Sequence, residues 1–216
     1  MNIPHKIVSL ADQVFERLEN EILSGQYARG EILTETRLSD DLGVSRTPIR
    51  EALRRLEQEH IVEVSTKGIE ILGVSEKDLA DIYEIRLQIE GIAAARAAEQ
   101  ATPESVAALR EAIELQEYYV NRGDAEHIKF TDSQFHEEVY RLSGSMILYD
   151  TLLPLHKKVQ KYRRASVQNA SRAEASLAEH REIFAAIEKK DADAAKAAMI
   201  RHVSNAMRHV IKQEGN

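Results

Sequence analysis

Residues 44–56 read Val44-Ser45-Arg46-Thr47-Pro48-Ile49-Arg50-Glu51-Ala52-Leu53-Arg54-Arg55-Leu56. The stretch predicts a helix with two opposed faces. Apolar side chains recur at helical spacing on one face, namely Ile49, Ala52, Leu53 and Leu56. Arginines recur every fourth residue on another face, namely Arg46, Arg50 and Arg54. Guanidinium groups bond phosphates and guanine edges in fixed geometry, so this face favours DNA recognition, although solvated helix faces are often charged too.

The residues around this helix predict a winged helix-turn-helix domain over residues 1–73. The expected elements are a helix over 9–24, a strand over 31–33, a helix from Thr34 to Gly43, the arginine helix, and strands over 61–64 and 69–71. A short helix followed by a tight turn and an arginine-faced helix is an arrangement that reads the DNA major groove. The turn between the last two strands forms the wing, where Lys67 and Gly68 suit an approach to the DNA backbone or minor groove.

The remaining chain predicts helices only. Their expected spans are 76–100, Thr102 to Gly123, Asp124 to Gly144, 146–168 as one or two helices around Pro154, 173–190 and 191–212. Such a set makes an all-helical bundle domain over residues 74–216. The expected fold is therefore mainly α, with three helices and a small β-hairpin wing in the first domain and a helical bundle in the second.

Composition narrows the class of protein. The 216 residues contain no cysteine, which excludes disulfides and thiolate metal sites, and there is no long apolar run or signal-peptide core. We therefore expect a cytoplasmic protein without a membrane partner. The net charge is −7, and residues 1–73 hold 9 Lys and Arg against 13 Asp and Glu. Positive charge is focused instead in residues 45–55, which hold four Arg and one Glu.

Four side chains of the second domain could form a metal site. Asp132 and His136 lie four residues apart and share a helix face, while His180 and His202 lie on the last two expected helices. Three imidazoles and one carboxylate suit zinc, manganese, nickel or iron and leave positions for water or a carboxylate ligand. Histidines on helix faces are more often ordinary solvated or core residues, so the spacing alone does not decide.

The chain resembles a known family of regulators. Gly43 to Leu53, reading GVSRTPIREAL, is similar to the signature of GntR-family bacterial transcription regulators. The tail resembles the FadR-type subfamily with an FCD ligand-binding domain. Its marks here are Tyr83-Glu84-Ile85-Arg86 with Glu90, Asp132-xx-Phe135-His136, Glu179-His180 and Met199-xx-His202. The resemblance implies a homodimer that binds an inverted-repeat operator and responds to a small organic acid, most commonly as a repressor.

The resemblance also implies which residues contact DNA. They are Ser45, Arg46, Thr47 and Arg50 at the turn and recognition helix, with Lys67 and Gly68 at the wing. The second helix departs from the family pattern, which commonly has an arginine directly after the glutamate that matches Glu35. Here that position is Thr36, and the arginine is displaced to Arg37, which becomes the candidate contact from this helix.

For the second domain, the resemblance implies a divalent ion of the zinc, nickel or manganese type. Its ligands would be Asp132, His136, His180 and His202, and the effector carboxylate could fill an open position on the ion. Arg86 and Arg164 are candidates to pair with the remaining charge of the effector, because a buried anion needs a cationic partner. The other histidines match no ligand position and are expected to be structural: His127, His156 and His209.

Three other readings stay open. The first is a dedicated metal sensor, in which the ion itself is the signal. The second is an enzyme with a single metal ion, although no general base stands beside the ligands and we expect no catalytic residue. A di-iron oxidase would need paired Glu-x-x-His motifs, and the chain has only Glu57 to His60. The third is an acyl-CoA-binding relative without metal, which the complete ligand set disfavours.

Overall fold

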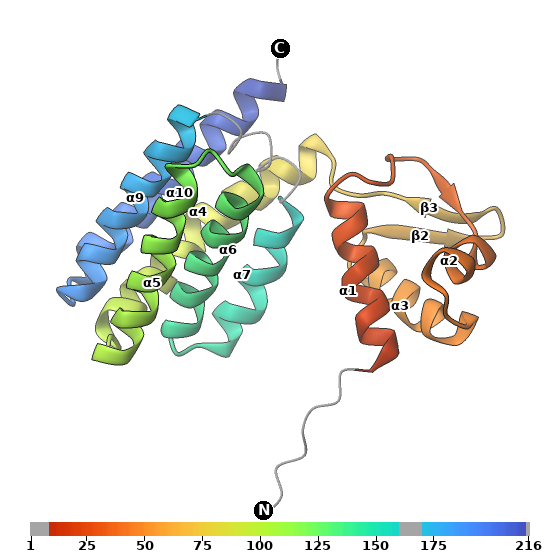
Figure 1. Cartoon of the computed structure of the whole chain (residues 1–216), viewed down its shortest axis with the longest axis horizontal. Coiled ribbons are helices and arrows are strands. Elements are labelled where there is room, and N and C mark those ends of the chain that lie inside the picture. The colour runs from red at the N-terminus through yellow and green to blue at the C-terminus, as the bar shows by residue number, and fades with distance from the viewer. Residues whose placement is uncertain (1–8, 160–169, 215–216) are drawn as a thin grey trace, which may run out of the picture. The chain divides into compact units, whose positions relative to one another are not determined.

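The computed structural model describes residues 9–159 and 170–214, with side chains as far as residue 210. They form two compact units, one ending at Ser75 and the other beginning at Glu76. The first unit combines short helices with a small sheet, and the second is built of long helices (Figure 1). Among the described residues, no helix is both long and apolar enough to cross a lipid bilayer.

The helices of the first unit begin and end where their capping residues predict. They are α1 (Leu10–Leu23), α2 (Glu35–Leu42) and α3 (Arg46–Gln58). Ser9 and Asp12 form a capping box at the start of α1, and the Thr34 hydroxyl accepts a hydrogen bond from the backbone N–H of Arg37 in α2. Gly43 ends α2 in the left-handed conformation, at φ +66°, which turns the chain into α3.

A three-stranded antiparallel sheet completes the first unit. Its strands are β1 (Ile32–Leu33), β2 (Val62–Ser65) and β3 (Gly68–Ile71), in the order β1-β3-β2. The predicted hairpin is confirmed, and the predicted short strand pairs with its second strand. Gly68 has a structural reason to be glycine: at φ +129°, a Cβ here would lie 2.7 Å from both Ile32 Cγ2 and the Leu33 carbonyl oxygen.

The core of the first unit lies between the helices and the sheet. Its buried side chains include Leu18, Leu38, Ile49, Leu56 and Ile69, contributed by α1, α2, α3 and β3. The apolar face predicted for the arginine helix is fully buried, whereas the three arginines of the other face are exposed. The helix is therefore fixed by one face and leaves the other to solvent.

The second unit is a bundle of helices that run alongside one another (Figure 1). They are α4 (Glu76–Glu99), α5 (Pro103–Val120), α6 (Ala125–Leu142), α7 (Met146–Lys158), α9 (Ala170–Glu188) and α10 (Ala192–Glu214). Helix α4 packs against α10, α6 and α7, and α5 packs against α6 and α9. Gly91 of α4 faces α10, where a Cβ would lie 2.9 Å from Ile200 Cγ1.

The predicted boundaries of this bundle agree with the structure to within a few residues. Thr102 caps α5 ahead of Pro103, and Asp124 caps α6. Pro154 lies inside α7, which ends at Lys158 with Val159 as its C-cap, and residues 160–168 of the helical span predicted over 146–168 lie outside the described residues. The fold class is as the sequence predicts: a winged helix-turn-helix unit followed by a helical bundle.

Candidate metal centre and nucleic-acid interface

Three histidines converge at the centre of the helical bundle. They come from three helices, His136 from α6, His180 from α9 and His202 from α10. The Nε2 atom of His202 lies 3.1 Å from Nε2 of His136 and 3.4 Å from Nε2 of His180. Asp132, one turn before His136, places Oδ1 at 3.8 Å from Nε2 of His180. All four residues are buried. The ligand atoms of the three predicted histidines lie within 4.8 Å of one another, and the predicted Asp132 adjoins them through His180.

The second nitrogen of each imidazole faces an oxygen acceptor. Nδ1 of His136 lies 3.0 Å from Oε2 of Glu90, Nδ1 of His180 lies 2.8 Å from Oε1 of Gln116, and Nδ1 of His202 lies 2.7 Å from Oε2 of Glu179. Each oxygen can accept a hydrogen bond from a neutral imidazole, which then carries its proton on Nδ1 and its lone pair on Nε2. Three lone pairs therefore point at one another, an arrangement that a shared cation stabilises.

The charge states of His202 and Glu179 suit this arrangement. Burial lowers the pKa of His202 to about 4, despite the opposing effect of its hydrogen bond to Glu179. Burial alone would raise the pKa of Glu179, but hydrogen bonds from His202 and Arg172 lower it to about 2. At neutral pH the imidazole is therefore neutral, as a metal ligand must be, and the carboxylate that orients it is charged.

A second polar cluster adjoins the first through His136. It contains Glu90, His136 and His156, whose ligand atoms lie within 4.8 Å of one another, and all three are buried. Burial lowers the pKa of His156 well below its ordinary value, so this imidazole is neutral. From the sequence, His156 is expected to be structural. The structure places it beside the ligand set, a position that no spacing in the chain indicates.

Arg86, a predicted effector contact, lies in this second cluster. Its Nε donates to Oε1 of Glu90 at 2.5 Å, and its side chain is only 2% exposed. Burial opposes its charge, but attraction to Glu90 outweighs that effect and raises the pKa of Arg86. Among the described residues, neither Nη1 of Arg86 nor the hydroxyl of Tyr83 has a hydrogen-bond partner. The other predicted effector contact, Arg164, lies outside the described residues.

The start of α3 presents the predicted DNA-reading groups to solvent. Ser45 is the N-cap without a side-chain hydrogen bond, and no acidic residue lies in the first turn, so the positive end of the helix dipole stays uncompensated by side chains. Arg46 and Arg50 are exposed, as are Thr47 and, at the wing, Lys67. Arg55 has a different role, because it pairs with Asp12 at 2.6 Å and lies over the Phe15 ring.

The arginines of this surface contact side chains of α2. Nε of Arg50 donates to both carboxylate oxygens of Glu35, each at 2.9 Å, and Nη2 of Arg46 donates to the Thr36 hydroxyl at 3.0 Å. Arg37 points to other partners, Glu31 at 3.1 Å and Asp41 at 3.6 Å. The sequence did not predict the contacts of Arg50 and Arg46 with α2, since they join two helices through their packing.

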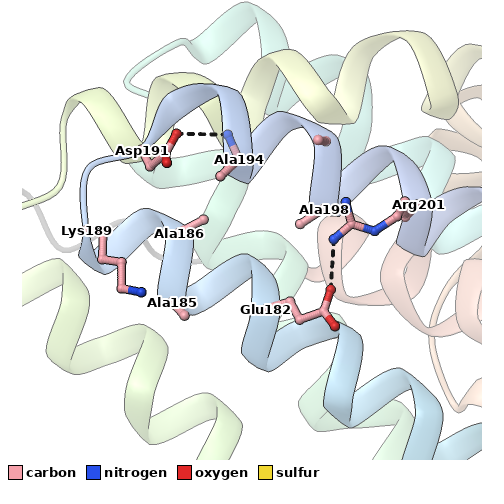
Figure 2. Close-up of a pocket in the computed structure, with 9 residues that line it drawn as sticks. Glu182, Ala185, Ala186, Lys189, Asp191, Ala194, Ala198 and Arg201 are labelled. Carbon is pink, nitrogen blue, oxygen red and sulfur yellow. Dashed lines mark hydrogen bonds and ion pairs between the residues drawn. The ribbon is translucent and has the colours of Figure 1, made fainter.

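A pocket also opens between α9 and α10 (Figure 2). Alanines make up most of its lining, and an ion pair between Glu182 and Arg201 crosses it at 2.8 Å. Glu182 and Arg201 are thus paired with each other, and Asp191 accepts from the backbone N–H of Ala194 at the start of α10. It offers no convergent set of donors comparable to the histidine centre.

Comparisons with known proteins match both parts of the chain. The family described as bacterial regulatory proteins, gntR family, matches residues 10–68, and the FCD domain family matches residues 81–205. The HTH-type transcriptional regulator YdhC of Bacillus subtilis is 31% identical over 208 residues, covering 94% of this chain and 92% of the relative. The gluconate operon transcriptional repressor of Bacillus licheniformis is 32% identical over 158 residues, 70% of this chain and 65% of the relative.

The solved structures include a close match in fold. Escherichia coli McbR/YncC superposes with a TM-score of 0.84 at 25% identity, covering 96% of this chain and all of that one. The relatives indicate a transcription regulator rather than an enzyme. The chain therefore belongs to the gntR family of bacterial regulatory proteins, in the FadR-type branch that carries an FCD domain, and is a DNA-binding transcription regulator.

Proposed function

We propose that this regulator represses transcription from an inverted-repeat operator, which it binds as a homodimer, and that a small organic acid held at a divalent metal ion controls it. The observation that carries the proposal is the convergence of three buried Nε2 atoms whose rings are each fixed by an oxygen acceptor. Burying four ionisable side chains is costly, and a ligand that needs all of them offsets the cost.

The ion would be held by His136, His180, His202 and Asp132, and would be of the zinc, nickel or manganese type. Two nitrogen ligands on one ion, each about 2.1 Å from it, lie roughly 3.0–3.4 Å apart for octahedral to tetrahedral angles. The Nε2 separations of 3.1 and 3.4 Å fit that range. When bound, the ion supplies a Lewis acid that attracts an effector carboxylate.

Two features support an organic acid as the effector. Arg86 carries a buried N–H group that has no partner among the described residues, and a second carboxylate or hydroxyl of the effector would satisfy it. A relative is named for repressing a gluconate operon, which is concerned with a sugar acid. Arg164 stays a second candidate for the same role.

On DNA, Ser45, Arg46, Thr47 and Arg50 would contact bases and phosphates. Lys67 and Gly68 would approach the backbone at the wing, and Arg37 would contact a phosphate in competition with its two carboxylate partners. A dimer would place two recognition helices in successive major grooves, about one helical turn apart. A tenfold change in operator affinity on effector binding needs only about 1.4 kcal/mol of coupling.

Three measurements on the purified full-length protein test the proposal. Elemental analysis should find about one divalent ion per chain, and fluorescence anisotropy should show a preference for promoter duplex over random duplex. A thermal-shift screen of carboxylic acids should find stabilisation that depends on added metal, because a ligand of the native state raises its melting temperature. A protein that neither carries nor takes up metal would refute the ligand assignment, and equal affinity for all duplexes would refute operator recognition.

A dedicated metal sensor is the second candidate function. The cluster of three buried imidazoles favours it, since their nitrogens could recognise an ion without any organic acid. Titrating metal into the metal-free protein in the presence of operator separates the two functions. Operator affinity that changes fully with metal alone would support the sensor and contradict metabolite control.

A further inference from the structure

Two side chains in the first turn of α2 accept hydrogen bonds from the first two arginines on the exposed face of α3. Glu35 and Thr36 are consecutive on α2, while Arg46 and Arg50 lie one helical turn apart on α3. The Glu35 carboxylate accepts hydrogen bonds from Arg50, and the Thr36 hydroxyl accepts one from Arg46. Such exposed contacts contribute little to folding stability. Their main effect is to fix the orientation of the two arginine side chains.

The contact with Glu35 leaves Arg50 able to read a base. A guanidinium group carries five N–H donors, and Glu35 occupies only the one on Nε, with both of its oxygens. The Glu35 contacts do not use the two Nη atoms, and a paired contact with O6 and N7 of guanine can use the end of the group that these two atoms form. Arg50 can therefore keep Glu35 and bind guanine at the same time, with its side chain already oriented.

Thr36 acts on Arg46 in the same way. Its hydroxyl accepts from Nη2 of Arg46, which leaves Nε and Nη1 for DNA. This position is where the family pattern described above commonly has an arginine. In this chain Thr36 occupies that position. The chain therefore lacks one positive charge there, but it has a neutral hydroxyl that orients the side chain of Arg46.

We propose that Glu35 and Thr36 are positioning residues that set base discrimination by fixing Arg50 and Arg46 before DNA arrives. The inference rests on the proposed DNA contacts of these two arginines. Glu35 also places a negative charge close to where phosphates pass, which weakens loose binding to any duplex. Hydrogen bonding to Arg50 lowers the pKa of Glu35, so the carboxylate stays charged at neutral pH.

The test compares charge removal at Glu35 with the same change elsewhere on α2. An operator is first selected from a random duplex pool by the wild-type protein. Glu35→Gln is then measured against that operator, its single-base variants and random duplex, beside the control Asp40→Asn, which removes the same charge at an exposed position of the same helix. Glu35→Gln should lower the ratio of operator to random affinity by about tenfold and relax one base position, as expected for loss of one oriented base contact.

Asp40→Asn should strengthen binding to all duplexes about equally and keep the base preference. A second pair tests Arg46: Thr36→Val, which removes the hydroxyl, should relax a different base position, and Thr36→Ser, which keeps it, should retain discrimination. Wild-type discrimination that survives unchanged in Glu35→Gln and Thr36→Val would overturn the inference alone. A wild-type protein that selects no operator would refute the proposed DNA recognition, and the inference with it.

Discussion

The arginines of α3 and the histidines of the helical bundle are two polar clusters in opposite environments. The arginine side chains are open to solvent, with Arg50 65% exposed, and their partners are exposed or partly exposed. The imidazoles are buried, with His180 0% exposed, and each has a fixed acceptor. Exposed charges cost little to keep and stay available for an incoming polyanion, whereas buried polar groups are expensive unless a ligand or network satisfies them.

The arginine cluster and the histidine cluster therefore call for different measurements. Changes among the arginines should alter DNA binding and leave stability nearly unchanged. Changes among the histidines should alter metal binding and the dependence of stability on pH.

His180→Ala should lower metal affinity by at least about 100-fold, beyond the usual effect of losing an outer partner, because it removes one of three converging nitrogens. Elemental analysis after dialysis and a competitive chelator titration measure the change. His127→Ala is the matched control, since His127 is 54% exposed and pairs with Asp124 at 2.7 Å. Equal metal loss in both variants would contradict the assigned centre.

The metal-free protein should lose stability as pH falls. Between pH 6.5 and about 4 the unfolded chain protonates His202 while the folded chain, with its pKa of about 4, does not. The unfolded state therefore gains protons first, which destabilises the fold by up to about 3 kcal/mol across this window. Glu179, with its folded pKa of about 2, adds a further loss in the same direction below pH 4.5.

Urea unfolding with a chelator present, at several values from pH 7 to pH 4.5, measures this loss. The variant His202→Gln lacks the group that titrates, so its unfolding free energy should depend less steeply on pH. An identical slope in wild type and variant would show that His202 is not the source.

Arg50→Ala should weaken operator binding by about 10- to 100-fold, which is the usual value of a paired contact with guanine. Its melting temperature should stay close to that of wild type, because the side chain is exposed. Arg17→Ala is the control: Arg17 is a 58% exposed arginine on α1, paired with Glu21 at 2.9 Å. Operator affinity that falls equally in both would point to general charge loss rather than base reading.

Glu179→Gln should lower metal affinity by about tenfold, at the lower end of the range for an outer partner. The amide oxygen can still accept from Nδ1 of His202, but the negative charge that strengthens the Nε2 lone pair as a metal donor is gone. Glu182→Gln, on the same helix and 61% exposed, serves as the control. Unchanged metal affinity in Glu179→Gln would show that Glu179 acts on His202 by orienting the ring and not through its charge.

The sequence predicts most of the fold because its boundaries depend on local chemistry. Ser9, Thr34 and Thr102 are caps in the structure because a hydroxyl before a helix satisfies its first N–H groups wherever the helix lies. The pairing of β1 with β3 depends instead on how distant segments meet, and Gly68 shows its reason only once Ile32 lies against it.

The candidate site also combines features that follow from local sequence with features that depend on the packing of distant segments. Asp132 and His136 share a helix face, so their proximity follows from spacing. His180 and His202 were candidates from their places on the last two helices, and the resemblance to a known family strengthened that prediction. Gln116 and His156 were not predicted, since α5 and α7 bring them to the centre only through packing of the bundle. The pairing of Glu35 with Arg50 spans two helices and was missed for the same reason.

Gly91 sets a limit for anyone who would engineer this domain to withstand heat. Helix propensity alone recommends replacing a glycine inside a helix with alanine, for a gain of about 1 kcal/mol. At this position the added methyl carbon would lie 2.9 Å from Ile200 Cγ1 and 3.2 Å from Lys196 Cγ, so α10 would have to yield. Because α10 also carries His202, we expect that substitution to disturb the proposed metal site as well, and thermostabilising changes are better made on other helices.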